Sequence, residues 1–189
     1  MRDLTDAEKE AILQSARVLA VAAAQGGSAE HGLPNELSQI EISGAFVSLW
    51  KGEQLRACVG NWRGDKVVEL GDSLVDAAHS AVTSDQRFSP IKAGEIPQLT
   101  VEVSLLHNVE PIPSKAESVE IGKHGLVIQH PNGRGLLLPS VATERNWDAE
   151  TFLENTAVKA GLPAAAWKWP DTQLTRFESL KLISDPEAT

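Results

Sequence analysis

Residues 45–60 read AFVSLWKGEQLRACVG, and this stretch predicts the hairpin around which the fold is built. Residues 45–50 have the hydrophobic and β-branched composition of a strand. Residues 51–53 form a tight turn around a glycine, and residues 54–60 form the second arm of the hairpin. The stretch therefore places an antiparallel strand pair in the first third of the chain.

The second arm of this hairpin holds Cys58, which is the only cysteine among 189 residues. Side chains of a strand alternate between its two faces, so Leu55, Ala57 and Val59 should point toward the core. Arg56 and Cys58 should then share the opposite face. A cation beside a thiol favours the nucleophilic thiolate, which makes this pair a candidate catalytic site. The alternative is that Cys58 is a small buried hydrophobic residue, as free cysteines usually are.

Outside the hairpin, hydrophobic periodicity and turn signals predict a mixture of helices and strands. A capping box from Thr5 to Glu8 begins a helix that ends at Gly26-Gly27. Further elements are expected as helices at 66–84 and 149–160, strands at 99–106, 125–129, 134–138 and 174–182, and a loop at 107–116. Because strands follow one another closely, the order favours an α+β fold with a largely antiparallel sheet flanked by helices. The chain length suits one domain, or one domain with a small subdomain.

Composition and charge exclude several classes of protein. The net charge of −9 argues against a general binder of nucleic acid or of anionic membranes, since either needs a basic face. A single cysteine forms no internal disulfide and no structural zinc site, and the five histidines show no ligand spacing. We therefore expect no metal and no cofactor. The acidic N-terminus lacks the features of a signal peptide, and no run is long enough to span a bilayer, so we expect a cytoplasmic protein.

Three polar residues away from the hairpin are further candidates. Asp85 and Arg87 can pair across a turn, and the alternative is a solvated ion pair of little energetic value. Glu102 lies on a predicted strand and can share a surface with Cys58, unless it simply marks the wet side of a half-exposed sheet. With Gly60, which follows Cys58 on the same face, these residues form the predicted binding surface.

Several segments resemble the signature segments of the AMMECR family. Leu55–Gly60 resembles its Leu-Arg-Gly-Cys-Ile-Gly motif, and the other matching segments are residues 46–49, 85–90, 101–106, 125–126, 137–142, 146–148, 152–153 and 159–162 with Trp167. They occur in the family's order. The resemblance implies a single α+β domain over residues 8–182, with short tails at 1–7 and 183–189.

The resemblance also implies a functional setting. Prokaryotic relatives are encoded with, or fused to, a Memo-like protein and a radical S-adenosylmethionine protein, which are therefore the expected partners. The family's signature has been proposed as a functional site, but its reaction is not established. This chain departs from the pattern at Ala57, where the family has glycine, and at Ala157, where relatives often have cysteine. The second departure argues against a mechanism that needs two cysteines.

Three functions remain open at this point. The chain is a component of the Memo and radical S-adenosylmethionine system that binds through the surface around Leu55–Gly60. Alternatively, it is a thiol-dependent enzyme in which Cys58 attacks a small or anionic substrate that Arg56 binds. The third function, contact with RNA through Arg56, Arg63 and the tryptophans, is disfavoured by the net charge.

Overall fold

The computed structural model describes residues 1–64 and 66–184, which divide into two compact units. Unit 1 comprises residues 1–106 together with the segment that begins at Leu180, and unit 2 comprises residues 107–179. Six strands form a sheet in the order β3-β2-β5-β8-β6-β7, and the β2–β3, β2–β5, β6–β7 and β6–β8 ladders are antiparallel. The α+β prediction is therefore confirmed. Strands β5 and β8 contribute residues to both units, and one domain over 8–182 stays a prediction.

Unit 1 contains two long helices and the central hairpin. Its elements are α1 (Asp6–Ala24), α2 (Asn35–Ser38), β1 (Glu41–Ile42), β2 (Gly44–Lys51), β3 (Gln54–Trp62), β4 (Val68–Glu69), α3 (Leu70–Thr83), the short 3₁₀ helix η1 (Ala93–Gln98), the first part of β5 (Thr100–Ile112) and the end of β8 (Gln173–Ser184). Strands β1 and β4 pair with each other as a separate two-stranded sheet.

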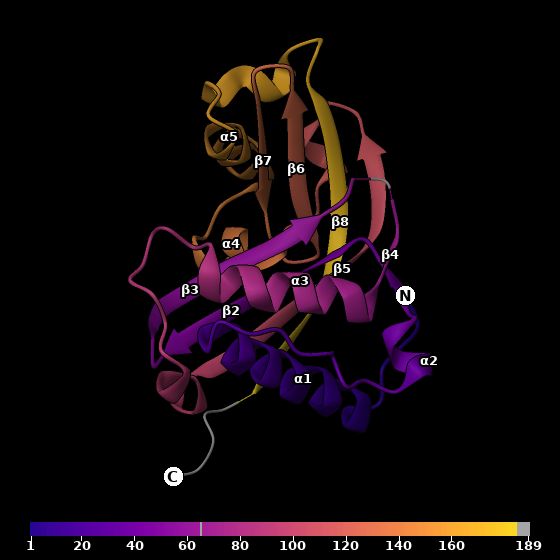
Figure 1. The fold of residues 1–189 in the computed structure, drawn as a ribbon. Helices are drawn as coiled ribbons and strands as arrows, with labels where there is room; N and C mark the ends of the chain where they lie inside the picture. Colours follow the sequence, from indigo (N-terminus) through magenta and orange to yellow (C-terminus); the bar gives the residue numbers. More distant parts are fainter. Residues whose placement is uncertain (65, 185–189) are drawn as a thin grey trace. The chain divides into compact units, whose positions relative to one another are not determined.

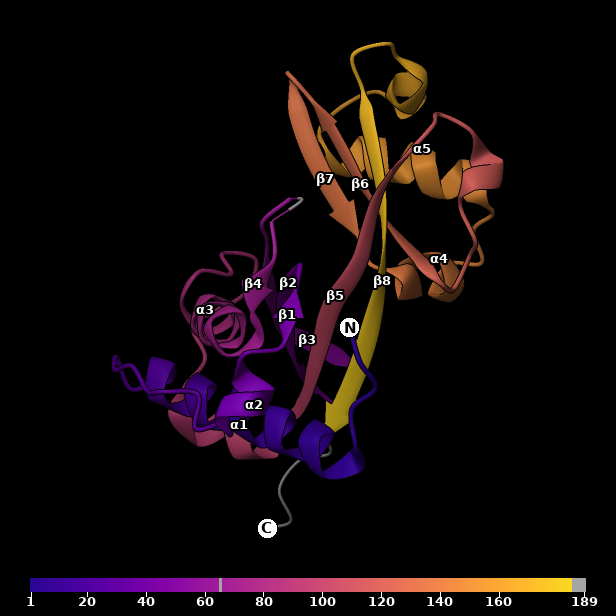
Figure 2. The same ribbon diagram turned by 90° about the vertical axis from the view of Figure 1, so that its right-hand side faces the viewer.

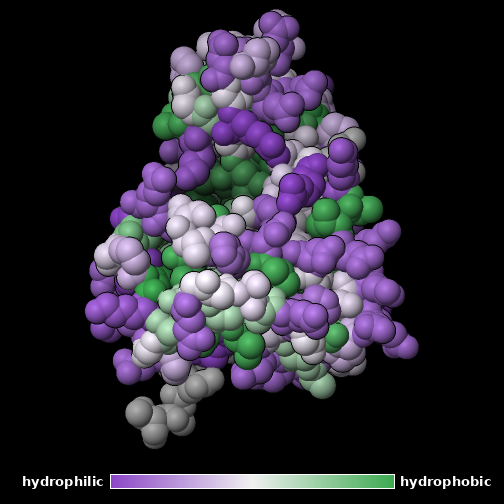
Figure 3. Space-filling view, in the orientation of Figure 1, coloured by the Kyte–Doolittle hydropathy of each residue, from purple (hydrophilic) through white to green (hydrophobic). Residues whose placement is uncertain are grey.

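Helices α1 and α3 cover one face of the unit 1 strands (Figures 1 and 2). Their apolar residues, such as Leu19, Leu74 and Ala78, form one core with Val47 of β2 and Ala57 of β3. Where Figure 3 shows α1 and α3, hydrophobic residues form only small separate patches among hydrophilic ones. The apolar stripe of each helix is thus directed to the sheet, as the hydrophobic periodicity predicts.

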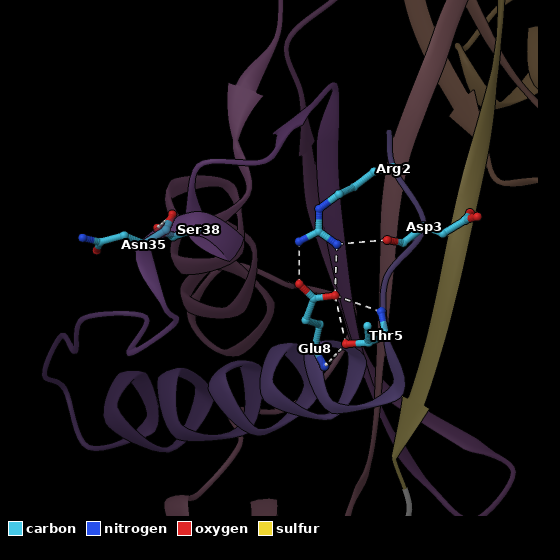
Figure 4. Close-up of polar contacts among 6 residues, drawn as sticks. All are labelled: Arg2, Asp3, Thr5, Glu8, Asn35 and Ser38. Carbon is cyan, nitrogen blue, oxygen red and sulfur yellow. Dashed lines mark hydrogen bonds and ion pairs between the residues drawn. The ribbon is translucent and has the colours of Figure 1, made fainter.

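The predicted capping box fixes the start of α1. The Thr5 N–H donates to Glu8 Oε2 at 2.8 Å, and the Glu8 N–H donates to Thr5 Oγ1 at 3.3 Å (Figure 4). Arg2 Nη1 also donates to Glu8 Oε2, at 3.0 Å. The hydrogen bond from Arg2 lowers the pKa of the Glu8 carboxyl to about 2. These contacts satisfy N–H groups that would otherwise lack partners at the helix end.

Unit 2 has a second hydrophobic core, formed by residues from its strands and its helices. It contains the remaining parts of β5 and β8 with η2 (Ala116–Ser118), β6 (His124–His130), β7 (Gly133–Leu137), α4 (Pro139–Glu144), α5 (Ala149–Lys159) and η3 (Ala164–Lys168). Asp148 caps α5 by accepting from the Thr151 N–H at 2.8 Å. Phe152 is fully buried against Leu126 and Ile128 of β6.

Several predicted element boundaries are wrong, and three of these errors change how a segment is assigned. The helix expected at 66–84 begins at Leu70, because residues 68–69 form β4 against β1. The loop expected at 107–116 is strand as far as Ile112, so Pro111 does not end β5. Residues 183–184 belong to β8, whereas residues 185–189 of the expected C-terminal tail lie outside the described residues. None of the helices in the described part combines the length and apolar character needed to cross a membrane.

Candidate functional site

Cys58 belongs to a row of polar side chains that crosses three strands. In the β2–β3 ladder Cys58 is opposite Ser48, and in the β2–β5 ladder Ser48 is opposite Glu102. Directly opposed residues point to the same face of a sheet. The thiol, the hydroxyl and the carboxylate therefore lie on one face, and we name these three residues the Cys58 row. Ser48 and Glu102 are buried, and Cys58 is half-buried.

The Cys58 row lies on the face turned away from α1 and α3. The alternate residues of the same strands, such as Val47 and Ala57, are completely buried in the core beneath these helices. Strand alternation then directs Ser48 and Cys58 to the other side. Ala57 has its methyl group on the core face, so the departure from the family's glycine does not alter the face that holds the thiol.

A β-bulge interrupts the hairpin next to this row. Leu49 is opposite Ala57, but the next residue of β2, Trp50, is opposite Leu55. Arg56 is therefore an extra residue without a partner in the register. A bulge bends the strand and redirects the side chains around it.

The bulge overturns the expected arrangement of Leu55, Arg56 and Cys58. Leu55 pairs with Trp50, two residues from Ser48, so Leu55 lies on the same face as Cys58. Arg56 instead lines a cavity with residues of α1 and α3, on the face that the helices cover. The prediction that Arg56 and Cys58 share one face is wrong, because one inserted residue exchanges the two faces of a strand.

Asp85 and Arg87 bind the backbone N–H and the backbone carbonyl of Cys58, respectively. The Cys58 N–H donates to Asp85 Oδ2 at 2.9 Å, and Arg87 Nη2 donates to the Cys58 carbonyl at 2.9 Å. The two side chains also bind each other, with Arg87 Nε 2.8 Å from Asp85 Oδ1 and Nη2 2.7 Å from Oδ2. A neighbouring strand would make the same two bonds to β3, which is the outer strand of the sheet. We call this arrangement the Asp85–Arg87 clamp.

The clamp sets the charge state of its own members. The hydrogen bond from Arg87 lowers the pKa of the Asp85 carboxyl to about 2, although burial acts in the other direction. The pKa of Arg87 is raised, chiefly by its hydrogen bond to Asp85. Arg87, rather than Arg56, is therefore the cation that is bonded to Cys58, through the Cys58 carbonyl oxygen.

Gly60 is required by close packing rather than by a special backbone angle. A Cβ atom at this position would lie 2.3 Å from Phe46 Cγ and 2.4 Å from the Ala45 carbonyl oxygen. Phe46 is opposite Gly60 in the ladder, two residues before Ser48. The glycine thus lets an aromatic ring lie across β3 on the face that holds the Cys58 row.

Two residues of the site are not identified by sequence reasoning. Lys181 Nζ lies 3.2 Å from Glu102 Oε2, so the buried carboxylate has a cationic partner from the C-terminal strand. Ser48 is the middle member of the Cys58 row. The predicted turn at residues 51–53 would pair Ser48 with Arg56, and the observed register with its bulge is what places Ser48 opposite Cys58. No local pattern relates Lys181 to Glu102, which lies 79 positions earlier.

The site has groups for binding and few for acid–base chemistry. In residues 1–64 and 66–184, no hydrogen bond joins a histidine to Cys58, and no three His, Cys, Asp or Glu side chains gather as metal ligands. Glu102 is paired with Lys181 and Asp85 is paired with Arg87. The arrangement presents a half-buried thiol beside a fixed cation.

Comparison with known proteins gives one consistent family. Residues 10–182 match the family model described as AMMECR1. A protein of Methanothermobacter thermautotrophicus is 41% identical over 160 residues, which cover 81% of this chain and 82% of the relative. A protein of Aeropyrum pernix is 36% identical, with coverage of 94% and 79%. The crystal structure of an uncharacterized protein from Pyrococcus horikoshii matches with a TM-score of 0.84 and 32% identity, over 94% of this chain and 92% of that one.

Proposed function

This chain belongs to the AMMECR1 family, and on that premise we propose that it is a binding component of a system that contains a Memo-like protein and a radical S-adenosylmethionine protein. The proposed contact surface lies around the Leu55–Gly60 motif on the face of the Cys58 row, with the half-buried Cys58 at its centre and Arg87 at its rim. One observation supports binding rather than nucleophilic catalysis: both polar members of the Asp85–Arg87 clamp are bonded to the Cys58 backbone. They rigidify an outer strand, and neither is placed to take a proton from the thiol.

The clamp protects the free edge of β3, the outer strand of the sheet, and keeps it in a fixed position for a binding partner. An unpaired strand edge can associate with any other strand, and proteins prevent this by occupying or charging the edge. In the clamp, two charged side chains bind the backbone N–H and carbonyl of Cys58 at this edge. About half of the Arg87 side chain stays exposed. Arg87 thus offers a positioned cation to a partner. Arginine is enriched where interfaces concentrate their binding energy.

The test is direct binding between separately purified proteins. The Memo-like and radical S-adenosylmethionine proteins of the same organism are titrated against the full chain by calorimetry. We expect one of them to bind, and Arg87→Ala to weaken the complex at least tenfold. Arg63→Ala is the matched control, because Arg63 is equally exposed and forms its ion pair with Asp76.

Two results would refute this role. Failure of both proteins to bind the wild-type chain would remove the proposed partners. Equal losses in the Arg87→Ala and Arg63→Ala variants would remove the proposed surface. Circular dichroism of each variant separates a lost contact from a lost fold.

One observation favours the second function, a thiol-dependent enzyme. Arg87 is bonded to the Cys58 carbonyl oxygen at 2.9 Å, and a cation close to a cysteine is the setting that favours a nucleophilic thiolate. The native chain should then react with iodoacetamide at Cys58, and Arg87→Ala should slow the alkylation while Arg63→Ala does not. Absence of labelling until denaturant is added would eliminate the nucleophile, whereas the binding role would be unaffected.

A further inference from the structure

Unit 1 contains a cavity on the face opposite the Cys58 row. A cavity of about 480 Å³ lies at the ends of α1 and α3, beneath the segment of residues 85–91. This volume is within the range of pockets that hold small organic ligands. Most of the lining side chains are apolar, and Arg56 contributes a cation among them.

The bulge is what brings Arg56 into this cavity. Regular alternation would place its side chain beside Cys58, and the extra residue in the register turns it to the helix side instead. The Arg56 side chain is only 12% exposed there. Bulges are common beside functional sites because they redirect a side chain in this way. The bulge thus positions a buried cation, and burying a charge is costly unless an anionic group pairs with it.

Within the protein, Arg56 has only long contacts to acceptor groups. Arg56 Nη2 lies 3.4 Å from Glu95 Oε2 and 3.5 Å from the Ser89 carbonyl oxygen. Both distances exceed the 2.7–3.2 Å that is usual for an N–H···O hydrogen bond. Both contacts use the same nitrogen, and among residues 1–64 and 66–184 no bond involves Nε or Nη1. The Nε–H and Nη1–H donors of the guanidinium are therefore available. Either of them can form a fork with Nη2, whose own contacts are long, and such a fork binds a carboxylate through both oxygens.

The surroundings determine which anion fits. The Asp85 carboxylate also lines the cavity, but Arg87 and the Cys58 N–H already satisfy it. Glu95 places a second negative charge near Arg56, and it is held by the Lys92 N–H at 3.1 Å. A dianion such as phosphate would face both carboxylates with one cation to bind it. A monoanion with an apolar body would pair with Arg56 and bury its body against Ala81, Val82 and Phe88.

We propose that this cavity, which we name the Arg56 cavity, binds a small monocarboxylate with an apolar or aromatic body. The proposal does not rest on the function proposed above, because the Arg56 cavity and the Cys58 row lie on opposite faces of β3. It assigns to Arg56 the role of binding the carboxylate. It assigns to Glu95 the role of a competing internal anion that holds Arg56 when the cavity has no ligand.

The test uses phenylacetate as the probe, with hexanoate and inorganic phosphate for comparison. Phenylacetate should bind the full chain saturably, with a dissociation constant of about 1 mM for a ligand of this size. Hexanoate should bind comparably, and phosphate should bind at least about tenfold more weakly. In nuclear magnetic resonance titrations, the amide signals of residues 85–91 should shift more than those of unit 2.

Four variants separate the Arg56 cavity from nonspecific binding. Arg56→Gln should weaken phenylacetate binding at least about tenfold, and Arg56→Lys should give an intermediate loss because it keeps the charge without the fork. Glu95→Gln should tighten binding, since it removes the competing carboxylate. Arg63→Gln removes the same charge as Arg56→Gln at an exposed ion pair elsewhere in unit 1, and it should change nothing.

Three results would overturn the proposal. These are no saturable binding of phenylacetate or hexanoate up to about 50 mM, equal affinities in the wild type and Arg56→Gln, or weaker binding in Glu95→Gln. Because Glu95→Gln is predicted to gain affinity, a variant that merely loses its fold cannot imitate the expected pattern.

Discussion

Replacing Asp85 with asparagine tests the energetic role of the Asp85–Arg87 clamp. Asparagine keeps an oxygen that can accept from the Cys58 N–H, but it removes the negative charge and replaces the oxygen that accepts from Arg87 Nε with an amide N–H₂ group. The carboxyl pKa falls from 3.8 to about 2 in the folded chain, which corresponds to about 2.4 kcal/mol of stabilisation. The Asp85 side chain is 5% exposed but Arg87 is 54% exposed. Solvent therefore screens part of the attraction, and we expect a loss of about 1–2 kcal/mol at pH 7.

The pH dependence gives the same prediction a second readout. A carboxyl whose pKa is lower in the folded state stabilises the fold above the unfolded value near 3.8. That stability is lost as the pH falls through 3.8 toward 2, where both states become protonated. Urea unfolding of wild type and Asp85→Asn should therefore differ most above pH 5, and the two curves should converge toward pH 2.

An exposed ion pair provides the control for this prediction. Asp76 lies 3.0 Å from Arg63, and both side chains are more than half exposed. Asp76→Asn should cost less than about 0.5 kcal/mol, as exposed pairs usually do. The reasoning is refuted if Asp85→Asn costs no more than Asp76→Asn, or if its stability curve runs parallel to that of the wild type down to pH 2.

Three further substitutions test the packing and capping of the two units by urea unfolding. Gly60→Ala should lower the free energy of unfolding by about 2 kcal/mol or more, because the new Cβ would lie 2.3 Å from Phe46 Cγ. Gly94→Ala is the control, since its Cβ would meet open space and should cost far less. Equal losses in the two variants would contradict the packing argument. Thr5→Ala removes one side of the α1 capping box and should cost about 1 kcal/mol, and no loss would mean that the cap adds nothing. Phe152→Ala opens a cavity in the fully buried core of unit 2 and should cost about 3–5 kcal/mol; a loss below 1 kcal/mol would show that this core rearranges to fill it.

The sequence by itself determined the elements whose patterns are local. The α1 capping box depends on residues three positions apart, and the hairpin depends on two hydrophobic runs joined by a glycine turn, so both were predicted with small boundary errors. The α+β class followed from the spacing of these elements. Cys58 stands out as the single cysteine, and Asp85, Arg87 and Glu102 occupy polar positions on which the family resemblance concentrates and which periodicity places off the core stripes.

Tertiary structure alone decided how those residues are used. Arg56 and Cys58 differ by two positions, which predicts a shared face, yet one bulge separates them because a two-residue period reverses when a residue is inserted. Arg87 lies beside Cys58 although 28 residues separate them in the chain, and Lys181 reaches Glu102 from the last strand. Such pairings depend on which strands and loops become neighbours. Long-range packing sets those neighbours, and no short pattern in the sequence records them.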